Sequence, residues 1–209
     1  LAELSPLQAV DYVNLNVTGS MQKDGIMSSV IATWANSDPH AALQWYLSQP
    51  EDTRQQAMGR FTLRGLYSSL AKQDLDAAIS SIETDLDASD FEAIEHAVSS
   101  TARHLQNTAE FEYLLERVQA MDNDSALQAV FSQWLTNDPD EALARLDLIS
   151  NPEQKQDIEE RAFRNWLVRD PEEAAERFMQ RAAPEQRQSR AKVVVESMSF
   201  NQPEQALSW

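Results

Sequence analysis

The 209-residue chain contains no cysteine. This absence excludes disulfide bonds, thiolate nucleophiles and cysteine-ligated zinc, and it leaves the redox compartment open. Glycine is also scarce, and no glycine follows position 65; the four glycines are Gly19, Gly25, Gly59 and Gly65. Most of the chain therefore lacks the residue on which tight β-turns and phosphate-binding loops depend. Together with the supply of good helix formers, this predicts an all-α fold.

Basic residues and long apolar runs are few as well. The 17 Lys and Arg residues face 34 Asp and Glu residues, which gives a formal net charge of −17. Such a chain repels phosphate groups, so we expect neither nucleic acid nor an anionic membrane as a partner. No run approaches the roughly 20 apolar residues of a membrane span. We therefore expect no membrane insertion by this segment, although 42% apolar residues suffice for a continuous core.

A repeated motif occupies much of the sequence. The frame W-x3-D-P-x2-A occurs three times, beginning at Trp34, Trp134 and Trp166. Weaker copies of its second half start at Pro6, Leu75 and Pro203, and a degenerate copy starts near residue 109. Successive starts lie 30 to 36 residues apart, and a regular period of about 33 residues is typical of helical repeat proteins.

Each part of the frame has a physical role. Asp followed by Pro is a helix start, because the carboxylate caps backbone N–H groups and Pro fits the first helical position. Ala three residues later, with apolar residues at the fourth and seventh positions, forms one apolar face of this first helix, helix A. A second helix, helix B, begins near Pro50, Pro152 and Pro184 and ends with the tryptophan. The three tryptophans are predicted to lie in the core between repeats.

This pattern predicts about seven helical hairpins. One hairpin cannot bury its apolar face alone, so neighbouring hairpins must stack, and residues 1–209 should form a single α-solenoid repeat domain. The period resembles that of tetratricopeptide-like repeats, and the frame is similar to Trp and Asp-Pro helical repeats of bacterial proteins. The resemblance spans the chain and implies a right-handed superhelical α-solenoid. Helix A lacks the tetratricopeptide pattern W-x2-L-G-x2-Y, so the peptide-carboxylate clamps of that family cannot be transferred.

Residues suited to catalysis or metal binding are rare. His40, His96 and His104 are the only histidines, no H-E-x-x-H, P-loop or G-x-S-x-G motif occurs, and no serine is recognisably paired with a base. The acidic run at residues 85–92 lacks the Gly and the closing Glu of an EF-hand, and we interpret it as a helix start capped by Asp87 or Ser89. We therefore predict a protein that is not an enzyme, with no catalytic residue, cofactor or metal site.

The best candidates for partner binding share one position, six residues after the start of helix A. We expect this position to be partly exposed; it is occupied by Trp45, Arg145, Arg177 and Trp209. The repeat and the lack of catalytic groups favour a scaffold or adaptor that binds a protein or peptide. The Arg-rich C-terminal end also allows self-association with the acidic middle of a second copy.

The alternative is an accessory region of a larger bacterial envelope enzyme whose catalytic domain lies elsewhere. The sequence begins at Leu1, and the last predicted hairpin starts at Pro203 but reaches only Trp209. We therefore expect a fragment of a longer protein. The sequence does not determine localisation; the four lysines and the start without Met incline slightly towards a bacterial periplasm or envelope.

Overall fold

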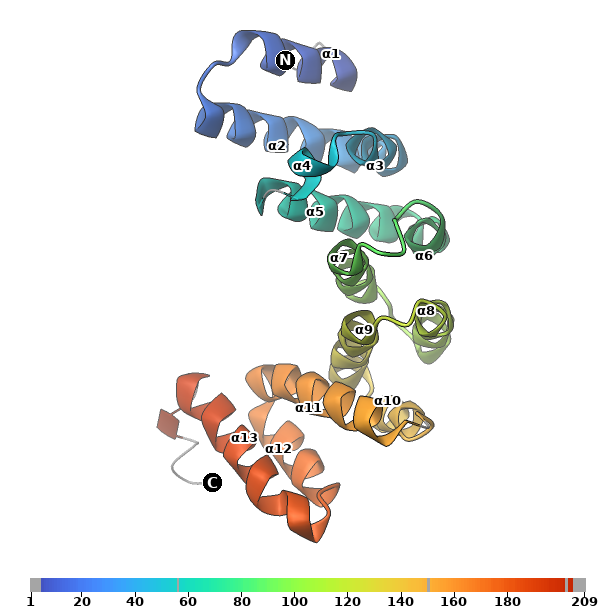
Figure 1. The fold of residues 1–209 in the computed structure, drawn as a ribbon, viewed down its shortest axis with the longest axis vertical. Coiled ribbons are helices and arrows are strands. Elements are labelled where there is room, and N and C mark those ends of the chain that lie inside the picture. Colours follow the sequence, from blue (N-terminus) through green and yellow to red (C-terminus); the bar gives the residue numbers. More distant parts are fainter. Residues whose placement is uncertain (1–4, 56, 150, 202, 205–209) are drawn as a thin grey trace. The chain divides into compact units, whose positions relative to one another are not determined.

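The computed structural model describes residues 5–55, 57–149, 151–201 and 203–204. All regular secondary structure in these ranges is helical (Figure 1), which confirms the predicted all-α class. The chain divides into two compact units, the N-terminal unit (Leu1–Leu105) and the C-terminal unit (Gln106–Trp209). The single continuous domain over residues 1–209 stays a prediction.

The N-terminal unit contains three helical hairpins, with a short extra helix in the second. Its helices are α1 (Pro6–Asn16), α2 (Ser20–Ser37), α3 (Pro39–Leu47), α4 (Glu51–Gln55), α5 (Ala57–Gln73), α6 (Leu75–Thr84) and α7 (Phe91–Ala102). Helix α5 lies at the centre of this unit, where it contacts α2, α3, α6 and α7, and α1 packs on α2. The unit therefore has a layer of B helices (α2, α5 and α7) covered by A helices.

The C-terminal unit repeats this arrangement. It comprises α8 (Thr108–Gln119), α9 (Asp124–Asn137), α10 (Pro139–Leu146), α11 (Pro152–Arg169), α12 (Pro171–Gln180), a 3-10 turn (Pro184–Gln186) and α13 (Arg187–Asn201). Helix α11 packs on α9, α12 and α13. Helix α9 in turn contacts α8 and α10. The seventh predicted hairpin lies outside the described residues apart from Pro203 and Glu204.

The predicted helix starts are confirmed. Asp38, Asp138 and Asp170 each accept a hydrogen bond from the backbone N–H three residues later, at 2.9, 3.2 and 3.3 Å, with Pro at the first helical position. Asn107 caps the degenerate copy in the same way, so that its helix A begins at Thr108, one residue before the predicted start.

One predicted cap is wrong. Helix α7 is capped by Asp90, which accepts from the Ala93 N–H at 3.0 Å, and not by Asp87 or Ser89. Asp87 instead accepts from the backbone and hydroxyl of Ser89, at 2.8 and 2.7 Å, in the turn before the helix. The acidic run therefore forms a turn followed by a helix cap, so its interpretation as a helix start is right although the capping residue is Asp90.

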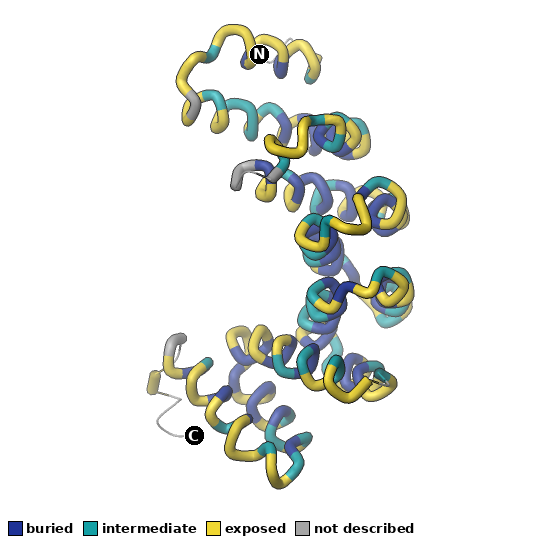
Figure 2. The backbone as a smooth tube through the Cα atoms, viewed as in Figure 1, coloured by how far each residue is buried: buried dark blue, intermediate teal, exposed yellow. Residues whose placement is uncertain are grey.

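The repeated tryptophans Trp34, Trp134 and Trp166 are all buried, as predicted. Buried residues follow the sides of the helices that face neighbouring hairpins (Figure 2). The spacing of three residues between Val195 and Met198 predicts that both lie on the apolar face of the last B helix, but this is wrong for Val195, which is 39% exposed, whereas Val194 is buried. The 3-10 turn before α13 accompanies this shift of the buried face by one residue.

Polar contacts between hairpins join residues about one repeat apart. In the N-terminal unit, Gln73 Nε2 donates to the Asn36 carbonyl at 3.0 Å, across 37 positions. In the C-terminal unit, Asn165 donates to Ser132 at 3.1 Å and Arg169 to Thr136 at 3.2 Å, each across 33 positions. These separations match the predicted period, so successive hairpins within each unit occupy equivalent positions.

Two glycines of α5 should respond oppositely to alanine. A Cβ on Gly65 would meet no heavy atom within 4 Å, whereas one on Gly59 would lie 2.2 Å from the Arg54 carbonyl oxygen. We expect Gly65→Ala to raise the free energy of unfolding by about 1 kcal/mol, because Ala is the better helix former, and Gly59→Ala to lower it. Urea unfolding followed by circular dichroism measures both, and changes of the same sign would contradict this packing.

Candidate functional site

The structure places the predicted partner-binding residues at one repeat position on three A helices. Trp45 on α3, Arg145 on α10 and Arg177 on α12 are all partly exposed, in agreement with the expectation for this position. Trp209 lies outside the described residues. The three described residues differ, however, in what their side chains contact.

The two arginines are engaged within the C-terminal unit. Arg145 forms an ion pair with Glu112 of α8, and Arg177 forms one with Asp140 of α10 at 2.7 Å. Each carboxylate belongs to the preceding A helix, so these arginines join neighbouring A helices. Their positive charges are thus matched inside the unit, which leaves Trp45 as the candidate whose surface opens onto a cavity.

Trp45 lines the first of two cavities beside α2. The first cavity has a volume of about 300 Å³ and is lined by residues from α1 to α5: Asn14, Lys23, Asp24, Met27, Ser28, Ile31, Trp45, Tyr46, Gln49, Thr53, Gly59 and Thr62. The second, of about 310 Å³, lies between α2 and α5 and is lined by Ser28, Ile31, Ala32, Ala35, Asn36, Phe61, Thr62, Gly65, Leu66 and Ser69. Because they share Ser28, Ile31 and Thr62, the cavities adjoin, and we name them together the α2–α5 groove.

The two halves of the groove differ in charge. The second cavity is lined by no charged side chain; small residues form most of its walls, and Phe61, which is 65% exposed, stands at its edge. The first cavity contains Lys23 and Asp24, neither of which forms an ion pair with a described residue. Its Trp45 ring lies against Trp34, with ring centroids 6.0 Å apart. The groove is therefore apolar at one end and polar, with an aromatic wall, at the other.

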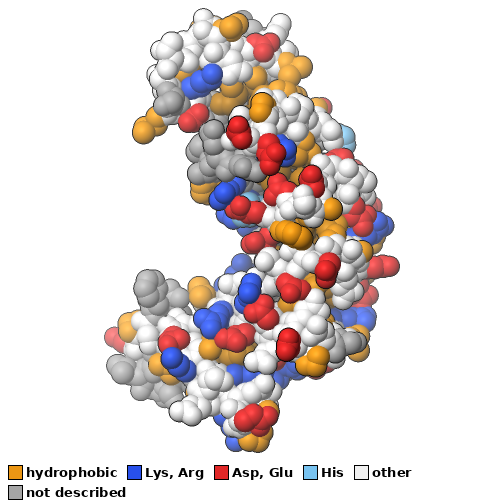
Figure 3. All heavy atoms as spheres, in the orientation of Figure 1, with side chains coloured by type: hydrophobic (Ala, Val, Ile, Leu, Met, Phe, Trp, Pro, Cys, Tyr) orange, Lys and Arg blue, Asp and Glu red, His pale blue; other side chains and the backbone are white. Residues whose placement is uncertain are grey.

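The N-terminal unit that contains the groove is acidic as a whole. Residues 1–105 contain fourteen Asp and Glu residues and six Lys and Arg residues. On the face of this unit in Figure 3, acidic side chains clearly outnumber basic ones, and hydrophobic side chains also reach the surface. The formal charge of the unit, −8, thus opposes the approach of an acidic ligand.

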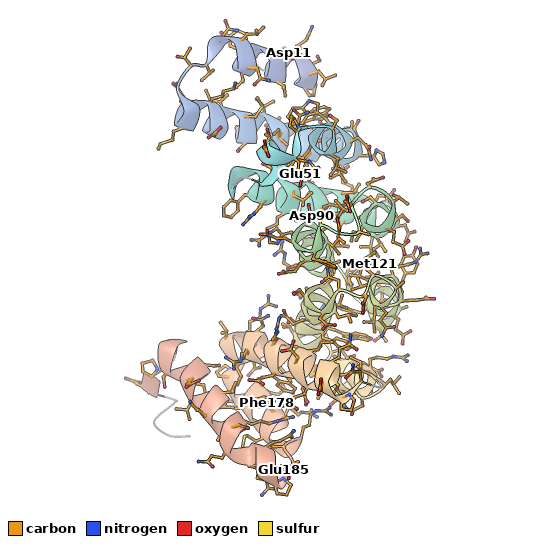
Figure 4. All side chains as sticks on the ribbon, viewed as in Figure 1. Asp11, Glu51, Asp90, Met121, Phe178 and Glu185 are labelled. Atoms are coloured by element: carbon orange, nitrogen blue, oxygen red, sulfur yellow. The ribbon has the colours of Figure 1, made fainter. Side chains whose placement is uncertain are left out.

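The other side of α5 is joined to α7 by polar contacts. Arg60 pairs with Glu92 at 2.9 Å, and Arg64 lies 3.0 Å from His96 Nδ1. Beside these contacts is a small cavity of about 30 Å³, which includes Glu51 and Asp90, labelled in Figure 4. Helix α5 is therefore asymmetric, because polar pairs fill its α7 side while the α2–α5 groove opens on its α2 side.

Two of the three histidines lie close together in the sequence, at positions 96 and 104, which predicts that they share one helix and are partly exposed. The structure corrects this: His96 is buried on α7, and His104 is half-buried in the turn after α7. His104 Nε2 is 2.9 Å from the Ser68 hydroxyl oxygen, a serine and base pair that sequence reasoning missed. Their spacing in the sequence could have indicated this pair, because the two residues are 36 positions apart, which is about one repeat. Neither residue lines one of the cavities described above.

These histidines predict a pH dependence of stability. Burial lowers the pKa of His96 and of His104 below the ordinary 6.5, and the cations of Arg64 and Arg103, respectively, lower them further. As pH falls below about 6.5, the unfolded chain therefore binds protons that the folded N-terminal unit does not. The free energy of unfolding should be highest above this pH and should decrease below it.

Urea unfolding at pH 7.5 and at pH 5.5 measures this dependence; the lower value lies above the ordinary pKa of carboxylic acids. We expect the decrease to become smaller in His96→Gln and His104→Gln variants, because neither replacement can be protonated. An undiminished decrease in the double variant would assign the effect to other groups.

The C-terminal unit contains a buried ion-pair cluster. Glu159 of α11 is buried and accepts from Arg181 at 2.7 Å and from Arg190 at 3.0 Å. The Arg190 guanidinium also lies over the ring of Phe178, 4.4 Å from its centroid, and donates to the Phe178 carbonyl at 2.9 Å; Phe178 is labelled in Figure 4. Hydrogen bonds from Arg181 hold the pKa of Asp147 well below its usual range. The cluster therefore joins α11, α12 and α13.

The ion pairs of the C-terminal unit occupy most of the arginines on which the predicted self-association depends. The six arginines predicted for that contact are Arg161, Arg164, Arg177, Arg181, Arg187 and Arg190. Five of them pair with carboxylates of the same unit. Among the described residues, Arg187 is the member of this group that forms no ion pair. Self-association through the C-terminal end stays a prediction.

Taken together, these features define an all-α protein of packed helical hairpins. Neither a protein-family model nor a curated protein nor a solved structure matched the chain. Within the described residues, no helix is long and apolar enough to cross a membrane, and no group of three or more His, Asp and Glu side chains could hold a metal ion. The α2–α5 groove is the site from which a function can be argued.

Proposed function

We propose that the protein is a non-catalytic adaptor that binds a peptide segment of another protein in the α2–α5 groove. The observation that carries this proposal is the pair of adjoining cavities of about 300 and 310 Å³ in the N-terminal unit. Ligand sites are concave, mostly apolar and furnished with a few polar groups. The groove has this composition, with Ile31 and Leu66 among its apolar residues.

The polar groups of the groove suit a peptide. Asn14 and Gln49 line the first cavity, and Asn36 lines the second. A side-chain amide both donates and accepts hydrogen bonds, as a peptide backbone does. Each cavity lies at the lower end of the range of about 300–1,000 Å³ for small-molecule sites, which is suitable for the individual side chains of a peptide.

We further propose that the hairpins of both units stack into one right-handed, tetratricopeptide-like α-solenoid. The support is the recurrence of polar contacts about 33 residues apart within each unit. Small-angle X-ray scattering from the full chain tests the elongated shape. A radius of gyration clearly above the roughly 17 Å of a compact domain of this length is expected, and a value near 17 Å would contradict the proposal.

A matched pair of glycines tests the binding site. Gly65 lines the groove, whereas Gly25 on α2 lines neither cavity, and a Cβ on either residue would meet no heavy atom within 4 Å. Leucine at position 65 should therefore fill the groove without disturbing the fold, and Gly25→Leu is the control. The probe is a phage-displayed library of random 12-residue peptides, selected on the full chain, from which enriched peptides are synthesised and their affinities measured by fluorescence polarisation.

We expect Gly65→Leu to weaken binding of the enriched peptides at least about tenfold, which corresponds to about 1.4 kcal/mol, and Gly25→Leu to leave it within about twofold. Circular dichroism should show both variants folded. Failure to enrich any peptide, or equal affinities of the two variants, would overturn the proposed function.

A further inference from the structure

We infer that the groove selects a basic peptide, which places a Lys or Arg side chain beside Asp24 and Trp45 in the first cavity and a bulky apolar side chain in the second. This inference rests on the proposed function and names the chemistry of the partner. It follows from the different chemistry of the two halves of the groove and from the charge of the surrounding unit.

The second cavity favours an apolar side chain because it offers no counter-charge to a cation or an anion. None of its lining residues is charged, and a charged group buried without a partner is strongly disfavoured. Its volume of about 310 Å³ can hold a side chain as large as Leu, Phe or Trp. The exposed ring of Phe61 and the side chains of Ile31 and Leu66 offer apolar contacts to such a residue.

The first cavity offers two features that favour a cation. Asp24 forms no ion pair with a described residue, although Lys23 is its neighbour on α2, so its carboxylate is available to a ligand. Trp45 is partly exposed in the same cavity, and the face of an indole ring attracts a Lys or Arg cation within about 6 Å. A cationic residue of the peptide would therefore meet a carboxylate and an aromatic ring together.

The net negative charge of the whole N-terminal unit adds to this preference. The N-terminal unit carries fourteen acidic and six basic residues. Four of its six basic residues already have contacts within the unit: Arg54 with a backbone carbonyl, Arg60 with Glu92, Arg64 with His96 and Arg103 with Ser100. A basic peptide is therefore attracted during its approach, and an acidic one is repelled. Binding should consequently weaken as salt is added.

The two selected side chains should be close in the peptide sequence. The cavities adjoin, because Ser28, Ile31 and Thr62 line both of them. An extended peptide advances about 3.3 Å per residue, so side chains one to four positions apart can enter neighbouring cavities. Enriched peptides are thus expected to carry Lys or Arg within four residues of a large apolar residue.

The test compares Asp24→Asn with Asp11→Asn. Asp11 is an exposed residue of α1 that lines neither cavity, so it controls for the loss of one negative charge. Each enriched peptide is synthesised with its basic residue and with Gln in that place. We expect Asp24→Asn to weaken binding of the basic peptide about tenfold and to change binding of the Gln peptide less than twofold, whereas Asp11→Asn changes neither more than twofold.

The outcomes separate the inference from the proposed function. The inference alone is overturned if the enriched peptides bind, lose affinity in Gly65→Leu, and either contain no basic residue or keep their affinity in Asp24→Asn. Enrichment of acidic peptides at this groove would do the same. If no peptide binds in a way that depends on position 65, the proposed function fails together with the inference.

Discussion

Glu159→Gln should lower the free energy of unfolding of the C-terminal unit by about 3–5 kcal/mol. The substitution keeps the shape of the side chain but removes the carboxylate that pairs with Arg190, whose side chain is only 10% exposed. Arg181 retains Asp147, at 2.6 Å, whereas Arg190 is left with the carbonyl and the ring of Phe178. A buried cation without a counter-charge explains the size of the expected loss. Urea unfolding followed by circular dichroism provides the measurement.

The neighbouring residue supplies the control. Glu160 on the same helix pairs with Arg164 at 2.7 Å, but both side chains are substantially exposed, and Glu160→Gln should cost no more than about 0.5 kcal/mol. Replacing both partners of the buried pair, as Glu159→Leu with Arg190→Met, should recover most of the stability, because well-packed apolar residues substitute well for a buried ion pair. Similar losses for the two Gln variants would show that burial of Glu159 is unimportant.

A comparable loss, about 3–5 kcal/mol, is expected for Trp134→Ala. Trp134 is fully buried and stacks on Phe111 and Phe131, with centroid distances of 5.2 and 6.2 Å. Truncation removes these contacts and leaves a cavity that the rigid helices of the C-terminal unit cannot close. The unfolding midpoint in urea should fall accordingly.

Two further variants define what the tryptophan contributes. The indole N–H of Trp134 finds no hydrogen-bond acceptor among the described residues, so Trp134→Phe loses no hydrogen bond and should cost far less than Trp134→Ala. Val168→Ala on α11, where the side chain is 51% exposed, should stay within about 0.5 kcal/mol of the parent. A small loss for Trp134→Ala would place this residue outside the core.

The architecture of the hairpins could be predicted because its determinants are local. An Asp before Pro specifies a helix start wherever it occurs, and Asp38, Asp138 and Asp170 all act as caps. The spacing of Ala and apolar residues defines the buried face of each A helix. Where these local signals weaken, the prediction was less accurate, as in the one-residue shift to Thr108 and the exposure of Val195.

The candidate site could be predicted only in part. The repeat position of Trp45 indicated partial exposure, but its cavity depends on how closely α2 and α5 approach, and no local pattern encodes that distance. The same position gave Arg145 and Arg177 as candidates, because sequence spacing did not reveal that Glu112 and Asp140 of the preceding A helices lie beside them. Pairs such as Ser68 and His104 become visible only when the repeats are aligned one above another.

Glu159 occupies the repeat position that Leu127 holds in the preceding hairpin, seven residues before the tryptophan. The shared frame alone does not distinguish one hairpin from the next. Here an exchange would set Leu127 opposite the Arg190 cation, or would bury a second carboxylate without its arginine. The buried ion pair thus disfavours a different order of these hairpins, and it makes gain or loss of a whole repeat at this point costly.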